Sequence, residues 1–517
     1  MGNQLGFKQY LLSWLILGGI TLLQAMSGTR FIYSACSNLM KRHYGISRMQ
    51  VNNLIVASES GKVFGCFPIA AKEYLPEWMI LVIGLMFGSV GYGALYLSIS
   101  TNYPSLSYGQ ILFFNVLAGN SICWINTYCD LLAAKNFKHT QDTVTELASG
   151  YSGLTGKIYT SLVEGIQGRK LVSEDSSKIY LLLSCLAPAT VGLAVALLNC
   201  VINVGEYEEA KLFPFVFVIV IATGVYAFIE NTAQPFTQMS LQLRVVNFML
   251  VVMLPLVVAL LMGARYIITL AKCDTQNTNE GVKITVENHE TVVTEKLAVG
   301  NENNGLKELV KSVDFWLFYM MNMCGVTLGM VYLNNLEIIS ESQGYHKPLF
   351  LLATSSTFVF FGRVFSLVFT WYTRETSIIS KPALTMLIMT SMPLAFFLLI
   401  ISSKMCLYIS TCIIATGLGA ITAIVASSTS EFLSTNSNSL INQTSIIPTN
   451  VPLGTFLFGY LASLIYDRDG SGDHQLCLGR FKCHHLTFTI WGFISSIGTI
   501  LSFSLYIRTR KNHSQKL

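Results

Sequence analysis

The chain has 517 residues, of which 52% are hydrophobic and 12% charged, with a formal net charge of +5. Soluble domains carry about 25% charged residues, so the composition excludes an ordinary soluble protein and indicates one embedded in a lipid bilayer. Its basic residues do not interleave with aromatics as a nucleic-acid surface requires, which excludes a nucleic-acid partner.

Apolar segments of about twenty residues, the length that crosses a bilayer core, recur along the whole chain. Eight precede a polar central stretch and six follow it, which predicts an all-α membrane protein with fourteen spans, or twelve as the fallback. The segments are 11–33, 50–71, 78–99, 109–134, 142–166, 179–201, 212–230, 245–270, 313–336, 349–371, 382–401, 405–430, 447–466 and 486–507.

The polar stretch 272–312 contains no aromatic residue from Cys273 to Ser312 and many charged ones. Such a segment cannot bury enough apolar surface to offset the entropy of ordering it. We therefore predict a disordered cytoplasmic tether between two membrane bundles.

Internal similarity groups the spans. The tetrapeptide beginning at Gly61 (GKVF) returns at Gly362 (GRVF), 301 positions later, and Asn38-Leu39 returns as Asn335-Leu336, 297 positions later. Two matches at nearly one offset support two parallel six-helix repeats. The predicted division is a bundle at 1–201, two additional spans at 202–271, the tether at 272–312, a second bundle at 313–508 and a tail at 509–517.

Fourteen spans place both termini on one side of the membrane. The tail Arg508-Thr509-Arg510-Lys511 marks that side as cytoplasmic by the positive-inside rule. The basic loop at Lys41, Arg42 and Arg48 disagrees, because this topology places it outside. The membrane is predicted to be the plasma membrane or an endomembrane such as the vacuole.

Several motifs resemble one known group. The chain is similar to the plant nodulin-like transporters of the major facilitator superfamily, including the nuclear-fusion-defective group. The resemblance implies the major facilitator fold: two six-helix bundles, here with two extra spans between them. The matching motifs are Ser27-Gly28-Thr29, Ala57-Ser58-Glu59, Ser121-Ile122-Cys123-Trp124, Asp314-Phe315-Trp316-Leu317, Asn334-Asn335-Leu336, Phe361-Gly362-Arg363, Thr429-Ser430-Glu431-Phe432 and Pro452-Leu453-Gly454.

Ionisable residues within predicted spans are candidate functional groups, because a charge in the bilayer centre is costly. Glu59 and Lys62 are three residues apart and can pair on one helical face. Glu59 is the first candidate for proton coupling, and a permanently paired structural ion bridge is the alternative.

Glu146 is the second proton-coupling candidate. It is eleven residues before Lys157, close to three helical turns, so the two are predicted to share one face of a single helix. Lys157 is a candidate for the substrate cavity. The glycines Gly150, Gly153 and Gly156 would allow a neighbouring helix to approach closely.

The other cavity candidates are cationic or amide side chains. Arg30 could attract an anionic substrate, pair with Glu59 or extend to the membrane interface. Arg363, the repeat counterpart of Lys62, suits anion binding or a fixed ion pair. The amides of Asn126, Asn334 and Asn335 could bind a ligand or join helices. Asp130 and Glu230 lie nearer span ends, where water can solvate them.

Cys477 and Cys483 form a compact pair in a polar loop with His474, His484 and His485. The loop is predicted to face an oxidising compartment, and the spacing is not a standard zinc pattern. Both points favour a disulfide over a metal site.

No catalytic residue, metal or cofactor is predicted. All eight histidines fall in predicted loops or the tail, and no phosphate-binding glycine loop with a following Lys-Ser/Thr is present, so an enzyme is not expected.

The sequence therefore predicts a monomeric secondary active transporter that moves a small solute by alternating access, with protons as the expected coupling ion. The alternative is a non-transporting membrane sensor or scaffold with a transporter fold. Convergence of Arg30, Glu59, Lys157 and Arg363 on one open cavity would favour the transporter, and mutually satisfied pairs would favour the scaffold.

Overall fold

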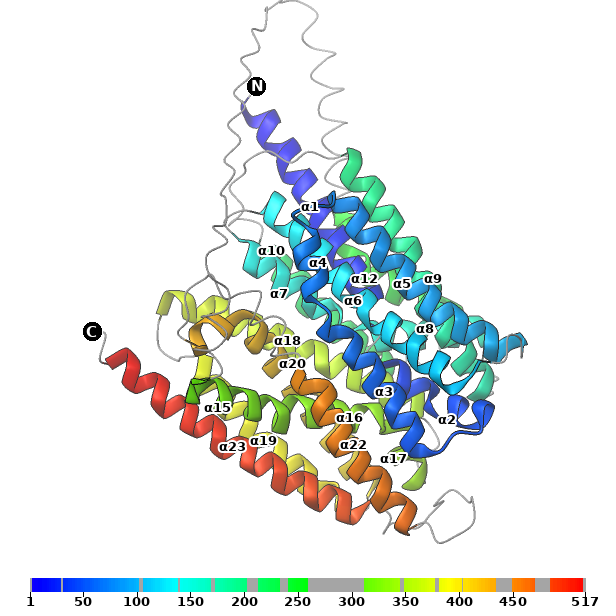
Figure 1. The fold of residues 1–517 in the computed structure, drawn as a ribbon. Coiled ribbons are helices and arrows are strands. Elements are labelled where there is room, and N and C mark those ends of the chain that lie inside the picture. Colours follow the sequence, from blue (N-terminus) through cyan, green and yellow to red (C-terminus); the bar gives the residue numbers. More distant parts are fainter. Residues whose placement is uncertain are drawn as a thin grey trace, which may run out of the picture.

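The computed structural model of the chain is helical throughout the part it describes. That part comprises residues 2–28, 31–101, 106–137, 140–168, 173–201, 213–232, 240–258, 311–344, 348–376, 381–401, 403–433, 449–469 and 484–514. Two groups of helices lie side by side, the N-terminal group in blue to green and the C-terminal group in yellow-green to red (Figure 1).

Before the tether, the chain forms eleven described helices. They are α1 (Gly2–Ser27), α2 (Ile32–Tyr44), α3 (Arg48–Val63), α4 (Cys66–Ala71), α5 (Glu77–Thr101), α6 (Tyr108–Asn136), α7 (Gln141–Tyr151), α8 (Thr155–Gln167), α9 (Ser173–Val201), α10 (Phe213–Thr232) and α12 (Leu241–Val252).

After the tether, the second group begins with a helix that contains a π-helical turn. The elements are α15 (Val313–Asn322), the π-helix η3 (Met323–Thr327), α16 (Leu328–Asn334), α17 (Leu336–Ser342), α18 (Pro348–Thr376), α19 (Lys381–Leu398), α20 (Lys404–Leu433), α22 (Asn450–Asp469) and α23 (His485–Ser514).

The closest helix contacts repeat in the two groups. On α3, a Cβ at Gly61 would lie 2.2 Å from the Val116 carbonyl oxygen of α6, and a Cβ at Gly362 of α18 would lie 2.1 Å from the Thr416 carbonyl oxygen of α20. Gly119 of α6 faces the Ser58 carbonyl oxygen in the same way at 1.9 Å. Only glycine permits such approach of two backbones. The repeated tetrapeptides therefore occupy equivalent packing positions.

Helices α10 and α12 lie against the seam between the two groups. Helix α10 packs against α18 of the second group and against α12, and α12 packs against α8 of the first group. A side-chain hydrogen bond of 2.8 Å from Asn231 Nδ2 to Thr354 Oγ1 joins α10 to α18. The inserted pair therefore contacts both bundles.

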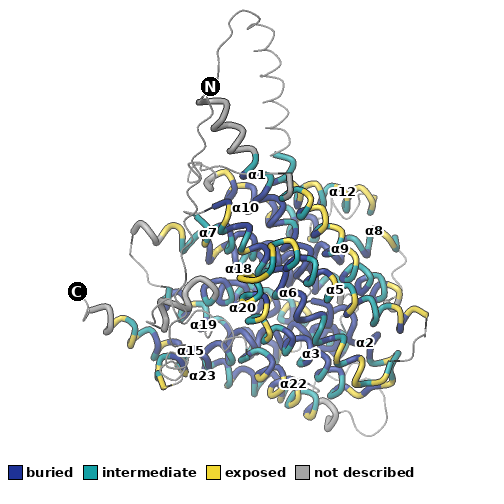
Figure 2. Tube along the Cα trace, turned by 45° about the horizontal axis from the view of Figure 1, so that its top comes forward, coloured by how far each residue is buried: buried dark blue, intermediate teal, exposed yellow. Residues whose placement is uncertain are grey.

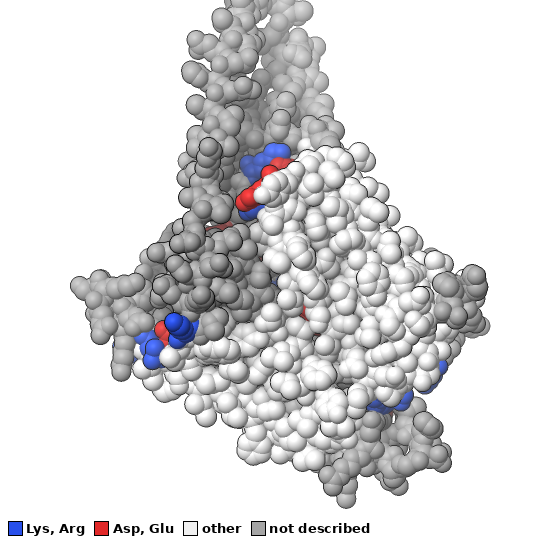
Figure 3. All heavy atoms as spheres, in the orientation of Figure 1, with Lys and Arg blue, Asp and Glu red and all other residues white. Residues whose placement is uncertain are grey.

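The outer surface is apolar in the way a bilayer requires. Buried residues fill the interior of the helix groups, and exposed ones lie on the periphery (Figure 2). Large hydrophobic side chains such as Leu197, Val218, Phe493 and Ile500 are exposed. The face drawn in Figure 3 is largely free of charged residues among those described. Such a surface is stable only in lipid or against a partner.

Ten helical stretches among the described residues are long and apolar enough to cross a membrane, and two shorter apolar helices accompany them at Leu241–Val252 and Asn450–Ile465. The all-helical membrane class predicted from the sequence is confirmed. The predicted segment 142–166 differs, because it is divided into α7 and α8 by a break at residues 152–154.

Candidate functional site

The predicted pair on α3 is present. Lys62 Nζ donates to Glu59 Oε1, and the carboxylate of Glu59 is buried at 6% exposure. Neighbouring α6 holds this stretch through a hydrogen bond of 2.9 Å from Asn120 Nδ2 to the Gly61 carbonyl oxygen. The pairing predicted from the i, i+3 spacing is therefore confirmed, and the proton-coupling role of Glu59 stays a prediction.

Arg363 extends from its own helix group to the other. From α18, its Nη1 donates to the Ser149 carbonyl oxygen of α7 and, at 2.8 Å, to the Ser152 hydroxyl just beyond α7. The side chain is buried at 5% exposure. These acceptors lie at the C-terminal end of α7, where unpaired carbonyl groups carry partial negative charge. Arg363 therefore joins the two bundles.

The break between α7 and α8 docks on α18 close to Arg363. Ser356 Oγ accepts from the Lys157 backbone N–H at 3.0 Å and donates to the Gly153 carbonyl oxygen at 2.5 Å. A Cβ at Gly153 would lie 2.9 Å from the Phe360 backbone nitrogen, whereas one at Gly150 would meet nothing within 4 Å. Close packing therefore explains Gly153 and leaves Gly150 without such a role.

This break corrects one prediction. Glu146 lies half-buried on α7, while Lys157 lies on α8, so the two do not share the face of a single continuous helix. The cause is the turn at Ser152-Gly153-Leu154: the Gly153 carbonyl accepts from Ser356 of α18, and the amides of Gly153 and Leu154 bond only three residues back, to Gly150 and Tyr151. The eleven-residue spacing is therefore no guide to their relative positions.

Lys157 belongs to a buried network of four charges. Its Nζ forms an ion pair with Glu230 Oε2 on α10, and Arg244 of α12 contacts Glu230 Oε1 at 2.6 Å and also Glu164 on α8. Lys157 Nζ is in addition 5.3 Å from the centre of the Phe248 ring, a cation–π arrangement. Two cations and two carboxylates balance, which limits the cost of burying them.

The network also corrects the expectation for Glu230. The residue was predicted near a span end in contact with water, yet it is 0% exposed. The prediction failed because hydropathy cannot show that Lys157 and Arg244, 73 and 14 residues away in sequence, would enclose it. Arg244 was missed altogether. Its only sequence signal is a charge directly before the predicted segment 245–270. Asp130, by contrast, is exposed as expected.

The three amide candidates lie apart from one another. Asn126 Oδ1 on α6 accepts from Gln24 Nε2 of α1 at 3.1 Å, so it joins two helices of the first bundle. Asn335 Nδ2 donates to the Val331 carbonyl oxygen of its own helix at 2.8 Å. Asn334 is buried at 5% exposure and lines a pocket between the bundles.

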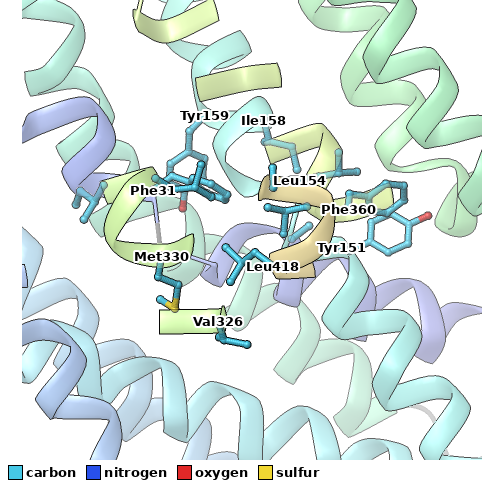
Figure 4. Packing of buried hydrophobic residues seen from close by; sticks show 14 of the residues in the cluster. Phe31, Tyr151, Leu154, Ile158, Tyr159, Val326, Met330, Phe360 and Leu418 are labelled. Carbon is cyan, nitrogen blue, oxygen red and sulfur yellow. The ribbon is translucent and has the colours of Figure 1, made fainter. Parts of the chain in front are cut away.

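That central pocket is apolar apart from Asn334, and its empty volume is 300 Å³, including the part open to solvent. Figure 4 shows the buried side chains that meet at this level from both halves. The pocket is lined by Phe31, Met330, Leu333, Asn334, Val359 and Leu418. Glu59, Lys157 and Arg363 each have separate partners, so these charges do not converge on it.

Three predicted site residues lie outside the described residues: Arg30 and the pair Cys477 and Cys483. Nothing is therefore added to their predicted roles. Among the histidines, His43 lies in the last turn of α2 and not in a loop. Within the described ranges, no three His, Cys, Asp or Glu side chains gather as a metal site requires.

A second set of contacts joins the bundles near the end of α2. Ser34 Oγ donates to the Leu333 carbonyl oxygen at 2.5 Å, and Ser37 Oγ donates to Glu337 Oε2 at 2.7 Å. Asn38 Nδ2 donates to Glu341 Oε2 at 3.0 Å. These residues were not predicted. The repeat of Asn38-Leu39 as Asn335-Leu336 marked this region without indicating its partners.

The fold is that of known transporters. A bacterial homologue of the human lysosomal transporter Spinster, in an inward-facing and unoccupied conformation, is similar with a TM-score of 0.56, 14% identity and 97% coverage of both chains. The xylose transporter XylE from E. coli, in a partially occluded inward-open conformation, has a TM-score of 0.52 at 10% identity. The match covers 97% of this chain and 98% of XylE. A structure from work on substrate recognition in proton-dependent oligopeptide transporters has a TM-score of 0.57 at 11% identity. The match covers 97% of this chain and 99% of that chain.

Sequence comparison is more specific. Residues 13–262 match the model of the Nodulin-like family, and residues 298–515 match the model of the NFD4 C-terminal domain. Protein NUCLEAR FUSION DEFECTIVE 4 of Arabidopsis thaliana is 30% identical over 529 residues, covering 96% of this chain and 89% of that protein. The resemblance predicted from the motifs is confirmed, and the chain belongs to the nodulin-like family of membrane proteins that includes NUCLEAR FUSION DEFECTIVE 4.

Proposed function

We propose that the protein is a secondary active transporter that moves a small solute by alternating access between two bundles. In this proposal the chain crosses the plasma membrane or an endomembrane fourteen times, and both termini lie in the cytoplasm. The bundles are residues 1–201 and 313–508, with the two additional spans at 202–271.

The observation that carries this proposal is the way the bundles meet. Hydrogen bonds join the bundles at Ser37 and Glu337 and at Arg363 and Ser152, helices of the two bundles pack against one another, and a small pocket lies between them. Such hydrogen bonds between two homologous bundles can break and re-form as the bundles rock as rigid bodies.

Proton coupling is the proposed driving force, with Glu59 as the first candidate and Glu146 as the second. A carboxylate that pairs with Lys62 can take up a proton only when the pair opens. Transport would then couple protonation of Glu59 to the state in which the Glu59–Lys62 contact is lost. The Lys62 side chain is 17% exposed, so the pair is not fully enclosed by neighbouring helices.

The test is uptake of a broad metabolite panel into liposomes holding the purified protein, with and without an imposed pH gradient. The variants are Glu59→Gln, the double Glu59→Gln/Lys62→Met, which leaves no unpaired cation, and Glu73→Gln, which alters an exposed carboxylate. Gradient-driven uptake that survives only in Glu73→Gln supports coupling at Glu59. Gradient-driven uptake in all variants would move the proton site to Glu146.

A second candidate function is a non-transporting sensor or scaffold. The observation that favours it is the separate pairing of Glu59, Lys157 and Arg363, which keeps these three charges away from the central pocket. Complete absence of flux for every compound, from protein that is folded and correctly oriented, would support this function over transport.

A further inference from the structure

A second pocket lies between the bundles, on the side that the predicted topology places outside. It is formed where α2 and α3 of the first bundle meet α17, α22 and α23 of the second. Its empty volume is 530 Å³, including the part open to solvent. We call this pocket the outer cleft. Its polar lining includes Lys41, Arg48, Asn52, His484 and Trp491, and none of the lining residues within the described part of the chain is acidic.

Local structure fixes the two cations of the cleft. Helix α2 ends at Gly45 with φ of +61°, a left-handed conformation that suits glycine. Two residues later, Ser47 caps α3 in a capping box with Gln50, so Arg48 is the first residue of the new helix. This tight turn brings Lys41 of the last turn of α2 and Arg48 to the same cleft. Arg48 is buried at 8% exposure.

The second bundle supplies a buried donor. Trp491 is 1% exposed, and its Nε1–H has no hydrogen-bond partner among the residues that the structure describes. The indole ring packs against Phe396 and Phe488 at centroid distances of 5.9 and 6.2 Å, so it cannot easily turn away. An indole N–H is only a donor, and a buried donor without an acceptor is costly. The missing group is therefore an acceptor.

Nearby acids do not fill this role. Glu337 and Glu341 of α17 face α2, where they accept hydrogen bonds from Ser37, Asn38 and its backbone N–H. Neither carboxylate lines the cleft. His484 packs beside Phe488 at 5.7 Å, and burial together with the Arg48 charge lowers its pKa to about 3, so it adds no carboxylate-like acceptor and no formal charge near neutral pH.

We propose that the outer cleft binds the carboxylate of a small organic anion, with Arg48 and Lys41 as the cationic partners and Trp491 Nε1–H as the donor from the opposite bundle. Arginine is suited to carboxylate because its planar fork can donate two parallel hydrogen bonds. Val51, Ile338 and Ile339 line the same cleft and would contact an apolar body.

The site accounts for an anomaly in the sequence. Lys41, Arg42 and Arg48 contradict the positive-inside rule in the predicted topology. Binding of an anion on the outer side would explain why a basic cluster lies there. Because the ligand would contact α3 and α23 together, its binding would favour the arrangement in which the two bundles meet at the cleft.

Binding is tested on the purified full-length protein, independently of flux, by thermal shift and by titration calorimetry. The probe is benzoate, with neutral benzamide as its isostere and chloride and phosphate as inorganic anions. Arg48→Gln removes the main cation, Trp491→Phe removes the N–H donor and keeps an aromatic ring, and Lys404→Gln is the matched control at an exposed lysine outside the cleft.

We expect benzoate to raise the melting temperature and benzamide to leave it unchanged. Benzoate affinity should fall at least tenfold in Arg48→Gln and severalfold in Trp491→Phe, and remain unchanged in Lys404→Gln. Equal benzoate affinity in the wild type and Trp491→Phe, or equal stabilisation by chloride and phosphate, would overturn the proposal. If Arg48→Gln does not fold, Trp491→Phe decides. A chain without transport activity could still bind, so the two proposals fail separately.

Discussion

The two halves share a backbone design and differ in how they use charge. Gly61 and Gly362 occupy equivalent positions, and the next residue is a cation in both, Lys62 and Arg363. In the first half, Glu59 lies three residues before Lys62 and pairs with it inside one helix. In the second, the position corresponding to Glu59, 301 residues later, is Phe360.

That single difference changes what the cation holds together. With Phe360 instead of an acid three residues before it, Arg363 reaches the C-terminal end of α7 in the other bundle. The first half thus satisfies its charge internally, and the second half satisfies its charge across the seam. Helix packing is therefore repeated, while electrostatic partners are specific to each half.

The largest expected effect concerns a feature found in only one half. Lys157 pairs with Glu230 in the network that attaches α10 and α12 to the first bundle. Lys157→Met removes one partner of a buried pair, which typically costs about 3–5 kcal/mol. We expect a large fall in melting temperature in detergent, with partial recovery in Lys157→Met/Glu230→Gln because the excess carboxylate is gone and Arg244 still pairs with Glu164. Equal stability of the two variants would show that the network is not electrostatically balanced.

The shared feature gives the next effect. A side chain at Gly61 or Gly362 would collide with a backbone carbonyl of the facing helix, so Gly61→Leu and Gly362→Leu should each destabilise by about 3 kcal/mol. Gly150→Ala is the matched control, since nothing lies within 4 Å of its Cβ position. Size-exclusion profiles and melting temperatures of the three variants measure the loss of stability. A much smaller loss in one half would contradict the equivalence of the repeats.

Sequence reasoning succeeded where a signal is local or repeated. Hydropathy predicted the helical membrane class, motifs predicted the family, and the i, i+3 spacing predicted the Glu59–Lys62 pair. It failed where a partner is distant in sequence: nothing near Lys157 indicates Glu230, and nothing near Arg363 indicates Ser149. The break at Ser152-Gly153-Leu154 was missed because it is stabilised by Ser356 of another bundle. Tertiary hydrogen bonds decide these features.

Loss of Arg363 should disturb the contact between the two bundles, whereas loss of Lys62 should disturb a contact within one helix. Arg363→Met removes charge-assisted hydrogen bonds between bundles, worth about 1.5–3 kcal/mol each, whereas Glu59→Gln/Lys62→Met removes a contact inside α3. Electron–electron distance measurements between spin labels, one on each bundle, should therefore show a shifted or broader distribution only for Arg363→Met. The same distribution for Arg363→Met and the wild type would mean that Arg363 does not hold the seam.

The smallest effect concerns acid stability at His484, a buried titratable group of the second half beside Arg48 and Lys41 of the first. Its pKa is lowered to about 3 in the folded protein, against about 6.5 in an unfolded chain, because burial and the Arg48 charge disfavour the imidazolium. Between these values the unfolded chain binds more protons, so stability is fully present above pH 6.5 and is lost as the pH falls.

Between pH 7.5 and pH 5 this loss amounts to about 2 kcal/mol at most, since one pKa unit corresponds to about 1.4 kcal/mol. His484→Gln keeps a polar side chain and removes the titration. The melting temperature of this variant should therefore fall less than that of the wild type over the same pH change, whatever its value at pH 7.5. An identical fall in both proteins would show that His484 does not remain neutral in the fold, and the cleft would then carry a third cation at acid pH.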